Sequence, residues 1–153
     1  MLSAWRLTKT KHLASAWDGQ GPKRFGGRWN SVGVPVVYTS GTISLALVEV
    51  LVHLTSRALP SYSAILVEFE ESLVYAVGAK ELPQKWRDHP APAGTRAVGD
   101  QWVADGRSAV LRVPSVVVPN EYKYVLNPNH PDFRQIRIGT PIAFPFDPRL
   151  LMP

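Results

Sequence analysis

The sequence predicts one mixed α+β domain in which strand exceeds helix. Its 153 residues are enough for one hydrophobic core, and 45% apolar with 19% charged residues is ordinary globular composition. Most of the 14 prolines stand in the second half, where they exclude long helices. Short β-branched and apolar runs between turn residues are typical of strands. The whole chain, residues 1–153, is therefore interpreted as a single domain.

Two strands and a loop are expected before the first long helix. Residues 3–8 and 34–39 are predicted strands, and the second of them is a β-branched apolar run. The stretch 18–27 is rich in Gly and Pro, so we expect a loop there.

The helix that follows is the most informative element. We expect it to run from a cap at Ser40 or Thr42 to about Leu54. It is apolar on almost every side, which indicates burial on most faces. Glu49 is its one charged residue, and Thr42, Glu49 and His53 share a narrow sector at about 100° per residue. This sector is either the solvated stripe of a core helix or a cleft wall that presents a carboxylate.

The elements after this helix are short. A strand is expected at 63–70, and a helix at 95–105 that Thr95 caps and Gly106 ends. Further strands are expected at 110–113, 116–118 and 141–146, and a short helix at 130–135.

Composition limits the class of protein. A formal net charge of +5 and a pI near 9.7 suit a nucleic-acid-binding module, but the basic residues are scattered. A positive cleft for an anionic small molecule explains the same balance. No apolar run reaches the roughly 18–20 residues of a membrane span, and no signal-peptide pattern opens the chain. With no cysteine present, these observations predict a cytoplasmic protein without disulfides.

Two places in the first half are candidate sites. In Gly26-Gly27-Arg28-Trp29-Asn30 the glycines allow a sharp turn or the close approach of a ligand, and Arg28 carries a planar fork suited to phosphate or carboxylate. Tyr38 ends an apolar strand just before the helix. Its ring either fills the core or stacks on an aromatic ligand.

Several well-known site patterns are missing. Ser115 stands in a Pro-bounded strand without a Gly-x-Ser-x-Gly elbow, which argues against a serine hydrolase. The four histidines lack metal-ligand spacing. The sequence has neither a Walker-type phosphate loop nor a Gly-x-Gly-x-x-Gly motif, so a Rossmann dinucleotide site is also disfavoured.

Taken in order, several segments resemble the RES-domain toxins, a family named for an arginine, a glutamate and a serine. The segments are Gly26-Gly27-Arg28-Trp29-Asn30, Val37-Tyr38-Thr39-Ser40, Leu45-Ala46-Leu47-Val48-Glu49, Pro114-Ser115 and Leu126-Asn127-Pro128. The resemblance runs from about Trp5 to Phe146. It implies a fold like that of ADP-ribosyltransferase toxins, with a split mixed β core and a few helices.

The resemblance also implies a function. The expected activity is cleavage of the nicotinamide–ribose bond of NAD, by hydrolysis or phosphorolysis, which depletes NAD and arrests growth. The expected partner is an Xre-type antitoxin that occludes the active site, so that DNA is contacted only through the antitoxin and no membrane is involved. Because NAD is the substrate, no separate cofactor and no metal are required.

The residues that carry the resemblance suit this chemistry. Glu49 would stabilise the oxocarbenium-like state or hold the ribose hydroxyls, and Arg28 would bind the pyrophosphate or a nearby hydroxyl. Tyr38 would stack on the nicotinamide ring. Ser115 would orient Glu49 or the ribose, and Asn127 is a further candidate for substrate binding.

Two alternative functions stay open. A protein ADP-ribosyltransferase would pass the ADP-ribose to a protein instead of to water or phosphate. A basic nucleic-acid-binding module belongs to another class, and it predicts salt-dependent binding that survives substitution of Glu49. The lack of a continuous basic stripe argues against the second alternative.

Overall fold

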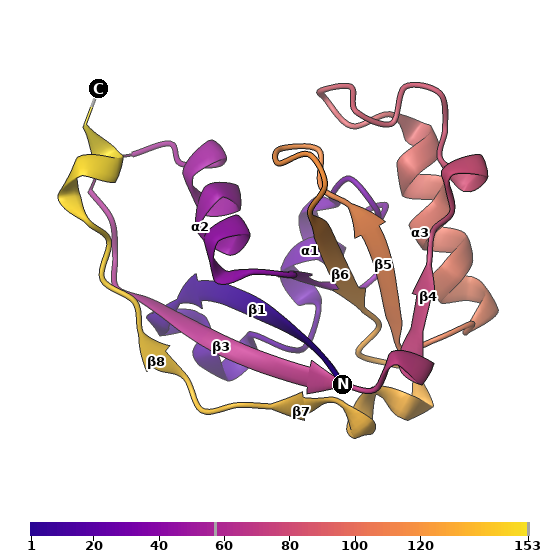
Figure 1. Ribbon diagram of the computed structural model, residues 1–153, viewed down its shortest axis with the longest axis horizontal. Helices are drawn as coiled ribbons and strands as arrows, with labels where there is room; N and C mark the ends of the chain where they lie inside the picture. Colours follow the sequence, from indigo (N-terminus) through magenta and orange to yellow (C-terminus); the bar gives the residue numbers. More distant parts are fainter. Residues whose placement is uncertain (57, 153) are drawn as a thin grey trace.

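The computed structural model describes residues 1–56 and 58–152, in which eight strands form one mixed sheet (Figure 1). The strand order is β4-β5-β6-β2-β1-β3-β7, and β8 also pairs with β3. The strands are β1 (Leu2–Lys9), β2 (Val37–Ser40), β3 (Tyr62–Phe69), β4 (Val74–Ala76), β5 (Val110–Pro114), β6 (Tyr122–Leu126), β7 (Arg137–Ile138) and β8 (Ile142–Ala143). β4 and β5 are parallel, and the other pairs are antiparallel.

Within residues 1–56 and 58–152, three α-helices and five short 3₁₀ helices accompany the sheet. The α-helices are α1 (Gln20–Phe25), α2 (Ile43–Val52) and α3 (Ala93–Asp105). The 3₁₀ helices are η1 (Thr10–Ser15), η2 (Glu71–Leu73), η3 (Ala79–Glu81), η4 (Pro131–Gln135) and η5 (Pro148–Leu151). Within the described ranges, none of the helices combines the length and the hydropathy that crossing a membrane requires.

The sheet divides into two halves between β1 and β2. β1 pairs with β3 along its whole length, from Leu2 opposite Phe69 to Lys9 opposite Tyr62. Toward the other half, β1 meets β2 at the pair Trp5 and Ser40. In Figure 1, α2 lies beside the half that contains β1 and β3, and α3 lies beside β4 and β5. The expected α+β fold with a split mixed β core is therefore confirmed.

Side chains alternate between two buried clusters on the central strands. On β6, Tyr124 and Leu126 belong to one cluster and Val125 to the other. The first cluster includes side chains of β1, β2, β3 and β5. The second cluster contains Trp29 and Trp102 together with side chains of β5 and β6. Because side chains in a strand alternate with a period of two, β5 and β6 contribute to both clusters. This burial on both faces anchors the elements that surround the candidate site.

Five of the predicted elements are confirmed with small shifts of their ends. They are the strands at 3–8, 63–70 and 110–113 and the helices at 42–54 and 130–135, observed as β1, β3, β5, α2 and the 3₁₀ helix η4. Thr42 is the N-cap of α2, because its side chain accepts a hydrogen bond from the Leu45 backbone N–H. The helix predicted at 95–105 begins two residues earlier, at Ala93, and ends at Gly106 as expected. Pro92 takes its N-cap position, and Thr95 instead donates a hydrogen bond to the Pro92 carbonyl.

The prediction of a loop at 18–27 is wrong, because the helix α1 occupies most of this stretch. Gly19 and Gly26 adopt positive φ at its two ends, and Asp18 accepts a hydrogen bond from the Gln20 backbone N–H. Pro22 is tolerated because the first N–H groups of a helix have no partner within it. The two glycines therefore mark the ends of a short helix, and the proline lies in its first turn.

Two predicted strands are shorter than expected and one does not form. β2 begins at Val37, since Pro35 has no N–H to donate to a ladder, and β8 contains Ile142 and Ala143 between Pro141 and Pro145. Residues 116–118 form part of the turn between β5 and β6 instead of a strand. Strands β4, β6 and β7 were not expected.

Gly99 allows α3 to pack closely against the backbone of the segment Gly26–Asn30. A Cβ at this position would overlap the Trp29 backbone carbonyl, and Gly99 is buried. We expect Gly99→Ala to lower the free energy of unfolding by about 2–3 kcal/mol, because α3 or the Trp29 backbone must move. Chemical denaturation measures this change.

The control for this prediction is Gly21→Ala in α1, where a Cβ would have no neighbour within 4 Å. It should leave stability unchanged or raise it by up to about 1 kcal/mol. Equal stability of the two variants would contradict the tight packing of α3 on Trp29.

Candidate active site

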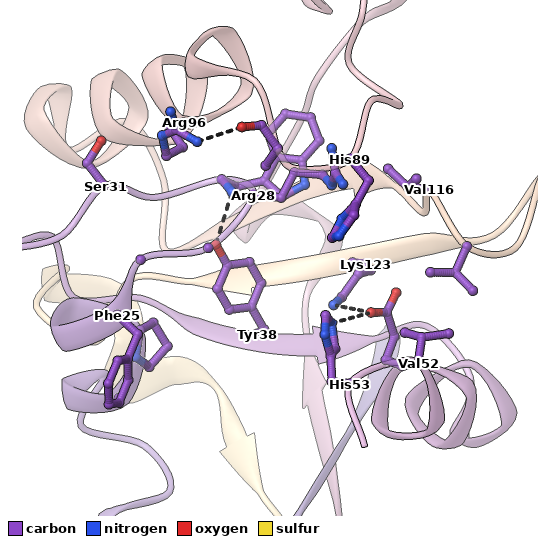
Figure 2. A pocket seen from close by; sticks show the side chains of 18 of the residues that line it. Phe25, Arg28, Ser31, Tyr38, Val52, His53, His89, Arg96, Val116 and Lys123 are labelled. Carbon is purple, nitrogen blue, oxygen red and sulfur yellow. Dashed lines mark hydrogen bonds and ion pairs between the residues drawn. The ribbon is translucent and has the colours of Figure 1, made fainter. Parts of the chain in front are cut away.

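A large cavity opens between α1, α2 and the β5–β6 turn (Figure 2). Its volume of about 1090 Å³ lies at the upper end of the roughly 300–1,000 Å³ that ligand pockets occupy. The ionisable lining residues are Arg28, Tyr38, Glu49, His53, His89, Arg96 and Lys123. Glu49 is the one carboxylate in the described lining, so the cavity is positive and suits an anionic ligand.

Tyr38 fixes the Gly-rich segment at the edge of this cavity. Its hydroxyl donates to Asn30 Oδ1 at 2.6 Å and accepts from the Trp29 backbone N–H at 3.1 Å. A Cβ on Gly27 would lie 2.7 Å from this hydroxyl, so a glycine is needed there. Burial raises the pKa of Tyr38 well above its usual value, and the hydroxyl stays protonated at neutral pH.

Arg28 follows this turn and reaches across to the segment before α3. Its Nη1 donates to the backbone carbonyls of Trp86 at 2.9 Å and Asp88 at 2.8 Å. Burial lowers the pKa of the Arg28 guanidinium, and the negative charge of Glu49 partly offsets that effect. Both of these hydrogen bonds use Nη1, so within the described chain Nε and Nη2 of Arg28 stay available to a ligand.

Glu49 projects from α2 and has a lysine and a histidine beside it. Its Oε2 lies 3.4 Å from Lys123 Nζ and 3.9 Å from His53 Nε2 (Figure 2). The Lys123 side chain is only 17% exposed, and its Nζ lies 5.2 Å from the centre of the Tyr38 ring. Burial lowers the pKa of Lys123, whereas Glu49 acts in the opposite direction. The largely buried side chain of Lys123 thus holds the Glu49 carboxylate close to the Tyr38 ring.

The sheet explains why Lys123 meets Tyr38. β6 pairs with β2 so that Tyr38 stands opposite Val125 and Ser40 stands opposite Lys123. Residues two apart in a strand share a face, so Lys123 lies diagonal to Tyr38 on the same side of the sheet. Lys123 was missed because β6 itself was missed; alternation in Tyr122–Leu126 would have placed it beside Val125.

Ser115 and Asn127 do not line the cavity. The Ser115 hydroxyl accepts hydrogen bonds from the backbone N–H groups of Val117 at 3.2 Å and Val118 at 3.0 Å. Asn127 Oδ1 accepts from the Asn129 backbone N–H. Both side chains are buried and shape turns. Of the five sequence-predicted site residues, the structure brings Arg28, Tyr38 and Glu49 together in one cavity.

Helix α2 is less buried than its apolar sequence indicates. Leu45 and Ala46 are its buried residues, and Val52 is 53% exposed. The expectation of burial on most faces is therefore wrong. Glu49 and His53 line the cavity, so the sector they share faces a cleft, while Thr42 caps the helix instead.

The fold and the cavity together define a mixed α+β domain with a positively charged cleft around one carboxylate. The RES domain family matches residues 3–147. The chain therefore belongs to the RES domain family, which confirms the resemblance seen in its motifs.

Relatives of known name match over nearly the whole chain. A protein of Yersinia enterocolitica named "Toxin Res" is 38% identical over 95% of this chain and 97% of the relative. A Sphingobium protein named "Prs ADP-ribosylating toxin" is 40% identical over 97% of this chain and 96% of the relative. The M. tuberculosis MbcT-MbcA toxin–antitoxin complex contains a similar fold, with a TM-score of 0.77 at 18% identity over 98% of this chain and 86% of that chain.

Lys123 gives the protein a testable pH dependence. Its pKa is lowered in the folded state, so between that value and 10.5 the unfolded chain binds more protons than the folded chain. The free energy of unfolding of the wild type, relative to Lys123→Met, should therefore rise with pH within this window. Denaturation curves of both proteins at several pH values measure the difference, and a difference that falls with pH would contradict the burial of a charged Lys123.

Proposed function

We propose that this chain is the toxin of a toxin–antitoxin pair and that it cleaves the nicotinamide–ribose bond of NAD. The observation that carries the proposal is the Glu49 carboxylate, held by Lys123 beside the Tyr38 ring in the same cavity as Arg28. An anionic dinucleotide with a cationic aromatic ring fits this combination of groups.

Each group has a role in the proposed reaction. Tyr38 offers its ring to nicotinamide, and the two hydrogen bonds of its hydroxyl keep the ring from turning. Glu49 stabilises the positive charge that develops on the ribose as the bond to nicotinamide breaks. Arg28 binds the pyrophosphate through the guanidinium nitrogens that are not bonded to the backbone. Lys123 keeps the Glu49 carboxylate in place.

A protein ADP-ribosyltransferase is the second candidate function. The observation that favours it is the Sphingobium relative, whose name is "Prs ADP-ribosylating toxin" and which is 40% identical to this chain. The same cavity and the same carboxylate would serve, and only the acceptor of the ADP-ribose would differ. Transfer of label from NAD to a protein in a lysate would distinguish the two.

Exposed apolar side chains at the mouth of the cavity support an antitoxin that covers it. Phe25, Val32, Val52 and Val117 all line the cavity and are between 38% and 77% exposed. Exposed apolar side chains gathered around a cavity are typical of protein-interaction sites. In this proposal the antitoxin is of the Xre type and excludes NAD from the cavity while it is bound.

Substitution of Glu49 tests the proposed activity. We expect Glu49→Gln to lower the rate of NAD consumption by at least about 100-fold, because the amide cannot balance the charge on the ribose. Purified wild type and variant are compared with and without phosphate, and the products are identified by mass.

The matched control is Glu70→Gln, an exposed glutamate that lines neither cavity described here. It should consume NAD at the wild-type rate. Full activity of Glu49→Gln would overturn the mechanism, and stable NAD with a folded wild type would favour a transferase that needs its protein target.

The apolar mouth predicts that the free chain binds a hydrophobic dye. Val52→Ser should lower the fluorescence of bound anilinonaphthalene sulfonate more than Ile142→Ser does, although both residues are 53% exposed. Of the two residues, Val52 lines the cavity together with the exposed Phe25, Val32 and Val117, whereas Ile142 does not. Equal effects of the two substitutions would argue against a partner surface there.

A further inference from the structure

The large cavity extends beyond the groups that the proposed cleavage uses. Figure 2 shows Arg96 and Lys123 on opposite sides of Tyr38. The cavity volume of about 1090 Å³ suits a whole dinucleotide rather than its nicotinamide half alone. With nicotinamide at Tyr38 and the pyrophosphate at Arg28, the adenosine half of the substrate reaches the end of the cavity that Arg96 lines.

Arg96 projects into this end of the cavity from the N-terminal part of α3. Its Nη1 donates to the Ala91 backbone carbonyl at 2.7 Å, so within the described chain Nε and Nη2 can donate to a ligand. The side chain is partly buried, and among the described residues it takes part in no ion pair. The cavity therefore holds a fixed guanidinium whose charge is not balanced by the protein.

The carboxylate one helical turn after Arg96 does not compensate this charge. Asp100 lies outside the cavity lining, where its Oδ1 accepts from the Ser31 backbone N–H at 2.9 Å and its Oδ2 from Ser31 Oγ at 2.5 Å. Glu49 is the one carboxylate in the described lining, and it contacts Lys123 on the other side of Tyr38. The adenosine end thus presents a guanidinium without a carboxylate.

Arg28 and Arg96 are fixed as two separate anion-binding groups. Arg28 is bonded to the backbone carbonyls of Trp86 and Asp88, whereas Arg96 is bonded to that of Ala91. The two nitrogens of Arg28 that are free of these bonds match the pyrophosphate by themselves. Arg96 is therefore available to a second anionic group, at the adenosine end of the ligand.

The charge beside the adenosine ribose distinguishes the two nicotinamide dinucleotides. In Rossmann-type sites a carboxylate bonds to the 2′-hydroxyl of NAD, whereas an arginine accommodates the 2′-phosphate of NADP. The physical reason, repulsion or attraction of a phosphate, does not depend on the fold. We propose that Arg96 binds the 2′-phosphate of NADP and that this chain therefore cleaves NADP as well as NAD. The inference rests on the proposed cleavage of the nicotinamide–ribose bond.

The 2′-phosphate takes no part in the bonds that change. The bond between the anomeric carbon and the nicotinamide nitrogen breaks, and its electron pair leaves with the nitrogen, which neutralises the cationic ring. With water as the acceptor, the water oxygen bonds to the anomeric carbon and one proton is released to solvent. The products from NADP are nicotinamide and ADP-ribose 2′-phosphate.

Ligand binding without turnover tests the role of Arg96. Calorimetry compares the dissociation constants of ADP-ribose and ADP-ribose 2′-phosphate, which differ only in the phosphate group that concerns the proposal. We expect the wild type to bind the 2′-phosphate form at least about tenfold more tightly, because hydrogen bonds between charged groups are strong. In Arg96→Gln this preference should fall below about twofold.

The matched control is Arg24→Gln in α1, which removes the same charge from an exposed residue. Arg24 lines neither the large cavity nor a smaller one of about 480 Å³ between β1 and the C-terminal end of α2. This variant should keep the wild-type preference. Arg96→Lys keeps the charge but not the planar fork, so it should keep part of the preference.

Two results of the binding experiment overturn the proposal. Equal affinities of the wild type for the two ligands would do so without any variant, so the proposal can fail even if Arg96→Gln does not fold. A preference that persists unchanged in folded Arg96→Gln would show that another group binds the 2′-phosphate.

Turnover separates this inference from the proposed function. In Arg96→Gln the ratio of kcat/KM for NADP to kcat/KM for NAD should fall about tenfold, whereas Arg24→Gln should keep the wild-type ratio. If the preference for the 2′-phosphate depends on Arg96 but neither dinucleotide is consumed, the binding site stands and the proposed cleavage fails. If NAD is consumed but NADP is not, or if the ratio does not depend on Arg96, the cleavage stands and this inference fails.

Discussion

The hydroxyl of Tyr38 joins the sheet to the segment that presents Arg28. It bonds to Asn30 and to the Trp29 backbone at once, and the missing side chain of Gly27 leaves room for it. The same ring lies beside Lys123, which in turn contacts Glu49. One buried phenol thus sets the distance between the Gly-rich turn, the sheet and the carboxylate. The candidate site depends on this hydroxyl staying protonated, which its burial ensures.

The fold could be predicted where one local signal dominates. Apolar runs identify β3 and α2, and Gly106 marks the end of α3. Prediction failed where two signals conflict. Glycine and proline around α1 are typical of a loop, yet they also occur at helix ends. β6 begins with polar residues whose burial depends on pairing with β2 and β5, and no local pattern reports such long-range pairing.

The site was predictable to a similar degree. Arg28, Tyr38 and Glu49 come from different segments, and the family resemblance placed them together before any geometry was known. The roles of Ser115 and Asn127 could not be read in the same way, because serine and asparagine side chains bond to nearby backbone groups in turns as readily as to ligands. Lys123 was not expected, because the strand β6 that carries it was not predicted.

The two backbone carbonyls that hold Arg28 also affect the thermodynamics of ligand binding. A free arginine side chain loses rotational entropy when it grips an anion, and this loss weakens binding. Here the carbonyls of Trp86 and Asp88 have already restricted the side chain before any ligand arrives. Binding through the remaining guanidinium nitrogens therefore proceeds with a smaller entropic penalty. The segment before α3, which is distant from Arg28 in the sequence, contributes to affinity without touching the ligand.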